Sequence, residues 1–304
     1  MNVGQREPRN ISVLCSLLGY SRQAYYQNCK AQERQALQEE LLLQEVLRVR
    51  KQQKRIGSRK LLVMLTNFMG QHGITIGRDG FFTLLRNHGL LVQKRKRSRA
   101  QTTFSHHWLR KYSNLIIDFI PIAPNQLWVS DITYIHLDDG FAYLSLITDA
   151  YSRKIVGFYL SEDLSAKGCI EALKMAFKNT SISGKLIHHS DRGLQYCSND
   201  YVTLLQDNRI RISMTQSGDP LENALAERVN GILKDELLEV CYSHLEHAQI
   251  EVAIAISIYN HYRPHSSIDM LTPAEAHLRT GELKKRWKNY YPTKQKEVTM
   301  EGPN

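Results

Sequence analysis

Three acidic residues stand where carboxylates often carry chemistry. Asp131 interrupts the apolar run WVSDITYI, which reads as a β-strand, and a charge buried there is costly unless it is paired or binds a metal. Asp191 closes the run LIHHSD, and the carboxyl ends of strands in α/β sheets are common sites of function. Glu227 lies in ENALAERVNGILKDE, which reads as a helix, with 35 residues between Asp191 and Glu227. The three acids would have to meet in space from separate elements.

Converging carboxylates of this kind predict a divalent metal centre. Mg²⁺ prefers hard oxygen ligands, and two ions roughly 3.5–4 Å apart can clamp the attacking and leaving oxygens of a phosphodiester. We therefore expect Asp131, Asp191 and Glu227 to be both the catalytic and the metal-binding residues, with two Mg²⁺ ions that Mn²⁺ can replace. Surface charge or an ion pair is the ordinary alternative for any one acid, and three acids in this arrangement weigh against it.

Glu222 competes with Glu227 for the third position. Five residues turn an α-helix by about 500°, so the two side chains cannot share one face, and the 35-residue spacing favours Glu227. Asn223 and Lys234, one turn before and two turns after Glu227, should face the same way, and we expect both to contact DNA, with orientation of the Glu227 carboxylate as the alternative for Asn223. An exposed helix lysine is an equal alternative for Lys234.

Other polar residues near these motifs have simpler readings. Asp149, next to Arg153 in the sequence, is interpreted as a structural pair, and it is also the most credible fourth acid. His188 and His189 precede Asp191 and are expected to be packed strand histidines, with a phosphate contact as the alternative.

Positive charge is concentrated before the carboxylates. Residues 1–115 hold 21 Lys and Arg against 6 Asp and Glu, a balance of +15, whereas the rest of the chain holds 19 against 24, a balance of −5. A basic half beside a mildly acidic half is typical of a polyanion-binding module joined to a carboxylate-using core, with a solvated basic surface as the alternative. The residues expected to contact DNA from this half are Ser21, Arg22, Lys54, Arg55, Arg59, Lys60, Arg78, Arg86, Lys94, Arg95, Lys96, Arg97 and Arg99.

The elements that would position these residues follow from hydrophobic spacing. Ile11 to Tyr26 reads as two short helices around a turn, with Gly19 ending the first and Ser21 capping the second, which is a helix-turn-helix pattern. Further helices are predicted at 32–53, 58–69 and 78–88. The later half predicts strands at 127–137, 141–150, 154–160, 185–190 and 210–214, and helices at 165–178, 199–206, 222–238 and 244–260.

This order predicts an α/β ribonuclease-H-like core preceded by an all-α helix-turn-helix DNA-binding region. We divide the chain into a helix-turn-helix and long helix (1–56), a second basic helical DNA-binding module and linker (57–100), the catalytic core (115–280) and a basic C-terminal tail (281–304).

Several sequence blocks carry a family resemblance. The blocks are WVSDITYI, TDAYSRKIVGF, HSDRGLQY, the NALAE helix and YNHYRPHSSIDMLTPAEA, together with LGYSRQAYY near the start. They resemble bacterial insertion-sequence transposases of the second-reading-frame type, with a retroviral-integrase-like DDE core. The resemblance covers roughly residues 10–280. The chain departs from it before Glu227, where DPLENALAER replaces the Asn-Cys-Tyr-Asp-Asn-Ala of many members.

The resemblance implies a Mg-dependent DNA transposase that binds the terminal inverted repeats of an insertion sequence. It implies strand cleavage, joining of the ends into a circular intermediate, and strand transfer into target DNA by a homo-oligomer that bridges two ends. The upstream reading-frame product is an expected partner. A catalytically inactive DNA-binding regulator derived from a transposase is the alternative, and a ribonuclease-H-type nuclease without strand transfer is a third reading. The intact triad counts against the regulator, and the large basic half counts against the simple nuclease.

Bulk properties exclude other classes. No apolar run approaches the length of a membrane helix, and the N-terminus lacks the apolar core of a signal peptide, so we expect a cytoplasmic protein associated with the bacterial nucleoid. The five cysteines are odd in number and far apart, which argues against a disulfide framework and against a Cys-X-X-Cys zinc site.

Overall fold

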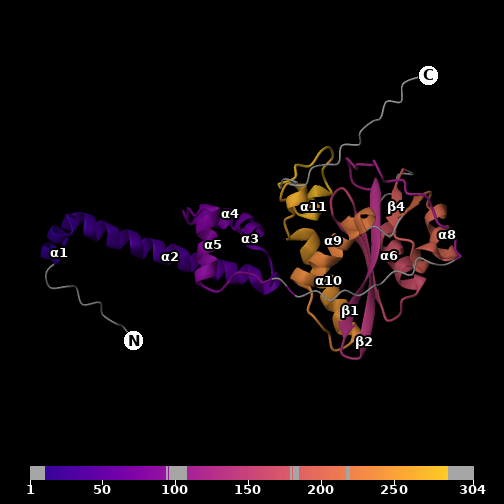
Figure 1. The fold of residues 1–304 in the computed structure, drawn as a ribbon, viewed down its shortest axis with the longest axis horizontal. Coiled ribbons are helices and arrows are strands. Elements are labelled where there is room, and N and C mark those ends of the chain that lie inside the picture. Colours follow the sequence, from indigo (N-terminus) through magenta and orange to yellow (C-terminus); the bar gives the residue numbers. More distant parts are fainter. Residues whose placement is uncertain are drawn as a thin grey trace, which may run out of the picture. The chain divides into compact units, whose positions relative to one another are not determined.

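The computed structural model describes residues 11–93, 95, 108–178, 180, 185–216 and 220–286. Two compact units make up the chain, Met1–Gln93 and Lys94–Asn304 (Figure 1). Within the described stretches, no helix is both long and apolar enough to cross a membrane. The predicted C-terminal tail lies almost wholly outside these stretches.

The first unit begins with α1 (Ile11–Leu17) and α2 (Arg22–Gln52). Gly19 adopts a left-handed φ of +72°, and the N–H of Tyr20 bonds the carbonyl of Cys15, so the first helix ends at the predicted glycine. The hydroxyl of Ser21 accepts the N–H of Ala24 at 3.1 Å, which confirms the predicted cap.

The second predicted short helix and the predicted helix at 32–53 are one continuous helix. No glycine or proline occurs between Arg22 and Gln52, so nothing in the backbone breaks the hydrogen-bond ladder of α2. The helix-turn-helix pattern of residues 11–26 is therefore a short helix that folds back beside the start of a 31-residue helix.

Three short helices complete the first unit: α3 (Ser58–Met64), α4 (Thr66–Gln71) and α5 (Arg78–Asn87). Their apolar side chains pack with the C-terminal part of α2 into one core. Its fully buried members are Leu42, Val46, Ile56, Leu61, Leu65, Phe81 and Leu85. The core thus begins at Leu42, and the first twenty residues of α2 contribute no buried side chain to it.

The second unit is built on a five-stranded mixed sheet in the order β3-β2-β1-β4-β5. The strands are β1 (Leu127–Leu137), β2 (Gly140–Asp149), β3 (Ile155–Ser161), β4 (Ile187–Ser190) and β5 (Arg211–Met214). The first three form an antiparallel meander, whereas β4 and β5 run parallel to β1. Each predicted strand starts and ends within two residues of the observed one, because the strands are apolar runs and the Asp-Asp-Gly turn marks the boundary between the first two.

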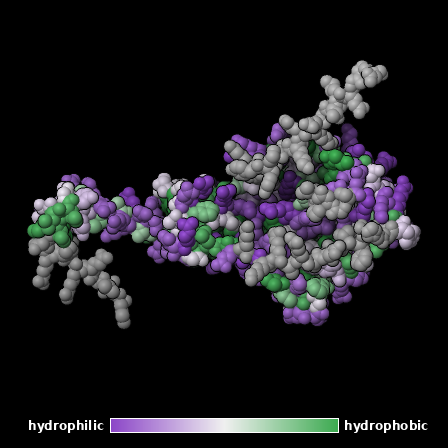
Figure 2. Space-filling model, in the orientation of Figure 1, coloured by the Kyte–Doolittle hydropathy of each residue, from purple (hydrophilic) through white to green (hydrophobic). Residues whose placement is uncertain are grey.

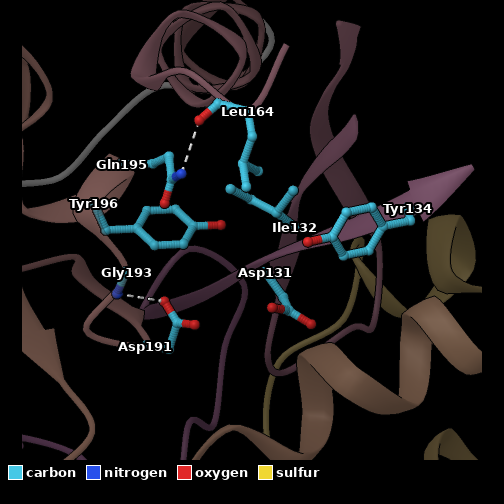
Figure 3. A pocket seen from close by; sticks show the side chains of 8 residues that line it. All are labelled: Asp131, Ile132, Tyr134, Leu164, Asp191, Gly193, Gln195 and Tyr196. Carbon is cyan, nitrogen blue, oxygen red and sulfur yellow. Dashed lines mark hydrogen bonds between the residues drawn. The ribbon is translucent and has the colours of Figure 1, made fainter. Parts of the chain in front are cut away.

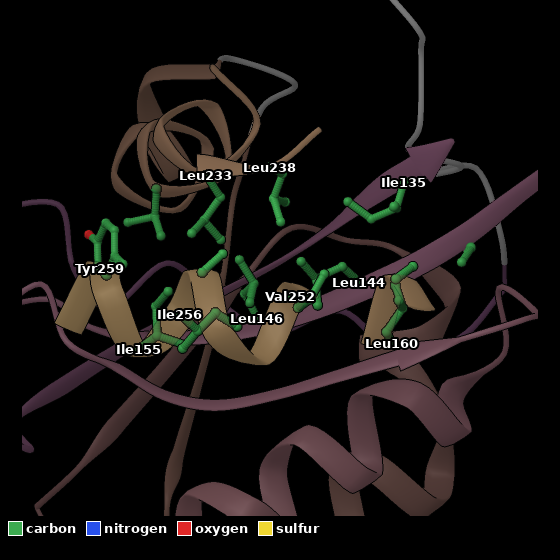
Figure 4. Packing of buried hydrophobic residues seen from close by; sticks show 14 of the residues in the cluster. Ile135, Leu144, Leu146, Ile155, Leu160, Leu233, Leu238, Val252, Ile256 and Tyr259 are labelled. Atoms are coloured by element: carbon green, nitrogen blue, oxygen red, sulfur yellow. The ribbon is translucent and has the colours of Figure 1, made fainter. Parts of the chain in front are cut away.

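Helices cover both faces of this sheet. On one face, α6 (Ala166–Lys178), α7 (Leu194–Cys197) and α8 (Asn199–Asp207) pack against side chains such as Trp128 and Ile147. On the other, α9 (Ala224–Ile232) and α10 (Leu245–His261) pack against β1, β2 and β3 (Figure 4). The resulting α/β/α layering agrees with the predicted ribonuclease-H-like core.

The predicted helix at 222–238 is divided into three parts. A 3₁₀ turn covers Pro220–Asn223, α9 covers Ala224–Ile232, and a π-helical turn covers Leu233–Leu237. The N–H of Leu238 bonds the carbonyl of Leu233 at 2.8 Å and closes the π turn. Short elements such as α7 and α11 (Pro273–Ala276) were not predicted, because four residues give too little periodicity.

Candidate active site

The pairing of β1 with β4 places two of the three acids side by side. In this parallel pair Val129 lies opposite His189, and the register ends there. Asp131 and Asp191 each lie two residues further along, so both side chains leave the same face at the carboxyl end of the pair. Figure 3 shows both carboxylates lining one pocket, and Tyr134, Gln195 and Tyr196 contribute to its wall.

Asp131 is held in an environment that disfavours its charge. Burial and, after it, the negative charge of Asp191 raise the pKa of this carboxyl to about 7, with a smaller contribution from Glu227 and against the opposing effect of a hydrogen bond from Asn230. The Asn230 amide donates to Asp131 Oδ2 at 2.7 Å. The three predicted acids are therefore close enough to interact electrostatically, and a cation would relieve the repulsion among them.

Asp191 is fixed by the loop that follows β4. Its Oδ1 accepts the N–H of Gly193 at 2.9 Å. A β-carbon at position 193 would lie 3.0 Å from that same oxygen, so any larger residue would push against the Asp191 carboxylate.

The two candidates for the third acid lie in different surroundings. Glu227 is exposed in the first turn of α9, and partial burial raises the pKa of its carboxyl. The Glu222 carboxylate accepts the N–H of Gln216 at 2.5 Å, and its carbonyl oxygen is 3.1 Å from His189 Nε2. Glu227, and not Glu222, is among the charges that raise the pKa of Asp131.

The described residues contain no cluster of three His, Cys, Asp or Glu side chains arranged to hold a metal. The donor set of Asp131, Asp191 and Glu227 nevertheless fits a hard divalent cation, because all three offer carboxylate oxygens and the charges of Asp191 and Glu227 both act on Asp131. The triad itself remains a prediction.

Two amides attach α9 to β1 at the site. Asn223 Nδ2 donates to the carbonyl of Ser130 at 3.0 Å, and Asn230 holds the neighbouring Asp131. Asn230 is 6% exposed, and sequence reasoning missed it. The available signal was its position one helical turn after Glu227, where an amide can reach the same strand.

Lys234 lies within electrostatic reach of Asp131. Burial lowers the pKa of its ammonium, and the charge of Asp131 opposes that shift. Two arginines hold the π turn that carries Lys234. Arg95 donates to the carbonyls of Lys234 and Leu238 at 2.6 and 3.0 Å, and Arg263 makes a two-pronged ion pair with Glu236 at 2.7 and 2.9 Å.

Asp149 and the paired histidines have structural surroundings. The Asp149 carboxylate accepts hydrogen bonds from the backbone of Asn125 and Ser152 and from the Ser152 hydroxyl, each at 2.7 Å. Its side-chain hydrogen bonds thus go to groups other than Arg153, the partner that sequence proximity suggested. His188 is fully buried, with its Nε2 2.7 Å from the Ser130 hydroxyl and 2.8 Å from the Tyr201 hydroxyl.

The residues predicted to contact DNA are distributed over both units. Three of them, Arg59, Arg86 and Lys54, are exposed near the ends of the short helices of the first unit. Arg55 donates to the carbonyl of Gln93, and Arg78 forms an ion pair with Asp79. Ser21 and Arg22 are exposed at the start of α2, and Lys60 is half-buried in α3. Lys94, Lys96, Arg97 and Arg99 lie outside the described residues.

Comparison with known proteins gives matches over most of the chain. The integrase core domain family matches residues 121–220 and, through a second profile, residues 208–273. An insertion element IS600 31 kDa protein of Shigella sonnei is 33% identical over 86% of this chain and 96% of its own length. The transposase for insertion sequence element IS629 of the same organism is 30% identical over 89% and 92%. The HTLV-2 integrase catalytic core domain, solved with magnesium, aligns with 52% of this chain and 99% of that chain at 18% identity and a TM-score of 0.42.

Proposed function

This chain belongs to the insertion-sequence transposases with an integrase core domain, and from that membership we propose that it is a DNA transposase. In this proposal it binds the ends of an insertion sequence and catalyses strand cleavage and strand transfer. The observation that carries the proposal is the meeting of Asp131 and Asp191 at the ends of β1 and β4, beside a helix whose Glu227 acts on Asp131.

The cofactor we propose is a divalent cation, Mg²⁺, held by Asp131, Asp191 and Glu227, with two ions and with Mn²⁺ as a substitute. Such a cation would activate water and stabilise charge on the reacting phosphodiester. The hydrogen bond from Asn230 and the N–H of Gly193 keep the two strand carboxylates oriented toward the pocket.

Lys234 would hold the phosphate of a terminal nucleotide. Its ammonium lies within electrostatic reach of Asp131. A positively charged side chain at this position attracts the phosphates of the DNA backbone. Asn223 would act differently, because its amide is bonded to the backbone of β1 and so fixes the first turn of α9.

DNA affinity is proposed to come mainly from the basic first unit. Neutralised phosphates release condensed counterions, so exposed Arg59, Arg86 and Lys54 would contribute in proportion to the contacts they make. The same proposal divides the chain into regions at 1–56, 57–100, 115–280 and 281–304. It includes the upstream reading-frame product as a partner and multimers that bridge two ends.

The experiment uses the purified full chain, linear DNA carrying the element's ends, and Mg²⁺. We expect nicks that free a 3′-hydroxyl at the ends, followed by joined strands, and neither product after chelation. A chain that binds the ends with ordinary affinity but never cleaves them would instead support the DNA-binding regulator. Cleavage without joining would support the nuclease.

A further inference from the structure

The tip of the first unit carries an apolar surface that the fold leaves uncovered. We define this tip surface as the exposed side chains of Val13, Leu14, Leu17, Leu18, Tyr20, Tyr25 and Tyr26. Leu17 and Leu18 are 77% and 70% exposed, and Tyr20 is 66% exposed. Figure 2 shows the corresponding hydrophobic patch over α1. Single exposed leucines are ordinary, but a contiguous group of this size usually marks an interaction site.

The tip surface is poorly suited to the DNA backbone. Between Ile11 and Cys29 the only charged residue is Arg22. Protein surfaces that bind duplex DNA by its phosphates carry several Lys or Arg side chains, since each contact neutralises one phosphate. The densest run of basic residues in this unit instead starts at Lys51, and residues 51–60 hold Lys51, Lys54, Arg55, Arg59 and Lys60. The chemistry of the tip therefore favours a protein partner.

The fold of the tip also leaves a helix without support. Only Leu42 and Val46 of α2 are fully buried, so about five turns of that helix, from Arg22 to Leu41, have no core to pack on. Cys15 is the one buried residue of α1. Helical segments of this length are marginal in water when propensity alone supports them, and most helical stability comes from packing an apolar face.

We propose that the tip surface is a docking surface for a second copy of this chain. The seven side chains expose on the order of 700 Å², close to the roughly 800 Å² that each partner buries in a standard interface. An isologous contact needs a single self-complementary patch, and this patch is nearly uncharged, so two copies meet without repulsion. Farther along α2, charges of both signs, such as Lys30, Glu33 and Arg34, would form the polar rim.

The geometry of the turn supports a rigid docking element. The left-handed Gly19 and the Ser21 cap fix the angle between α1 and α2. The rings of Tyr25 and Tyr26 pack edge to face, with their centroids 5.4 Å apart. A preorganised pair of helices loses little conformational freedom on binding, and a second pair would complete a four-helix arrangement.

The test is sedimentation equilibrium of the full chain in DNA-free buffer. We expect the wild-type chain to form dimers in the micromolar range, and the double variant Leu17→Glu/Leu18→Glu to associate at least about tenfold more weakly. A matched control, Val240→Glu/Leu278→Glu, places two glutamates at sites of the second unit that are 68% and 88% exposed, and should associate like the wild type. Circular dichroism should show unchanged helix content in both variants.

A second measurement does not depend on charge. Ser16→Cys, in a Cys241→Ser background, places a thiol on the exposed side of α1, and a bifunctional maleimide should join two copies through it. A wild-type chain that stays monomeric at tens of micromolar, or glutamate variants that associate normally, would overturn the proposal. Loss of end-DNA binding by the glutamate variants with unchanged association would assign the tip to DNA instead.

The tip surface rests on the proposed function, because it would join the copies of the multimer. The docking surface and the transposase activity can nevertheless fail separately. Association is measured without DNA and without a divalent ion, and Asp131→Asn should self-associate like the wild type. An active enzyme with no tip-dependent association refutes only the docking surface. A tip-dependent dimer that cannot cleave DNA refutes only the proposed activity.

Discussion

Replacing Asn230 with leucine should weaken the use of Mg²⁺ without unfolding the protein. The Asn230 amide donates to Asp131 Oδ2 at 2.7 Å, while its own Oδ1 has no hydrogen-bond partner within the described residues. A hydrogen bond to a charged group contributes about 1.5–3 kcal/mol. Residues that orient metal ligands typically change metal affinity or activity by roughly 10- to 100-fold when removed. We therefore expect the Mg²⁺ concentration for half-maximal end cleavage to rise by roughly that factor in Asn230→Leu.

The assay is cleavage of end-containing DNA over a range of Mg²⁺ concentrations, with thermal unfolding measured in parallel. Asn260→Leu is the matched control, because Asn260 is also buried but exchanges two hydrogen bonds of 2.9 Å with the backbone of Ile155. The control should lose stability and keep the Mg²⁺ dependence of the wild type. An Asn230→Leu protein that cleaves within twofold of the wild type at every Mg²⁺ concentration would refute the reasoning.

Three other perturbations follow from single contacts. Gly193→Ala places a β-carbon 3.0 Å from Asp191 Oδ1, so end cleavage should fall roughly tenfold at unchanged melting temperature, and full activity would contradict this. Burial lowers the pKa of His188 to about 3, so the unfolded chain binds a proton below pH 6.5 that the folded chain does not. Between pH 6 and 4 the free energy of unfolding of the wild type should fall by up to about 1.4 kcal/mol per pH unit more than that of His188→Gln. Urea unfolding that shows the same pH dependence for both proteins would argue against this. Arg263→Met leaves Glu236 without its two-pronged partner and should lower the free energy of unfolding by about 3–5 kcal/mol, which unchanged urea denaturation would exclude.

Much of the site could be predicted because its parts are local. Asp131 and Asp191 are recognisable as charges in or at the end of apolar strands, and the pleat then fixes the face on which each lies. Ser21 and Gly19 are equally local, because a cap and a left-handed turn depend on one or two residues.

Other features depend on contacts that the sequence does not display. The π turn at Leu233–Leu237 coincides with the Arg263–Glu236 ion pair, which joins residues 27 positions apart. The hydrogen bond from Asn230 to Asp131 likewise joins residues 99 positions apart, and the place of Asn230 one turn after Glu227 gave only a partial signal of it. The continuity of α2 was predictable in principle, since it lacks a breaker, but the helix-turn-helix pattern of residues 11–26 suggested that a separate short helix ends before residue 32.

In the proposed active site Glu227 completes the triad with Asp131 and Asp191, whereas Glu222 does not. The most direct measurement is the rate of Mg²⁺-dependent end cleavage by Glu227→Gln beside its matched control Glu222→Gln. We predict that Glu227→Gln loses at least about a hundredfold in rate at normal folding and DNA binding, and that Glu222→Gln stays within a few-fold of the wild type. An active Glu227→Gln protein, or a Glu222→Gln protein that folds normally and is inactive, would contradict the account.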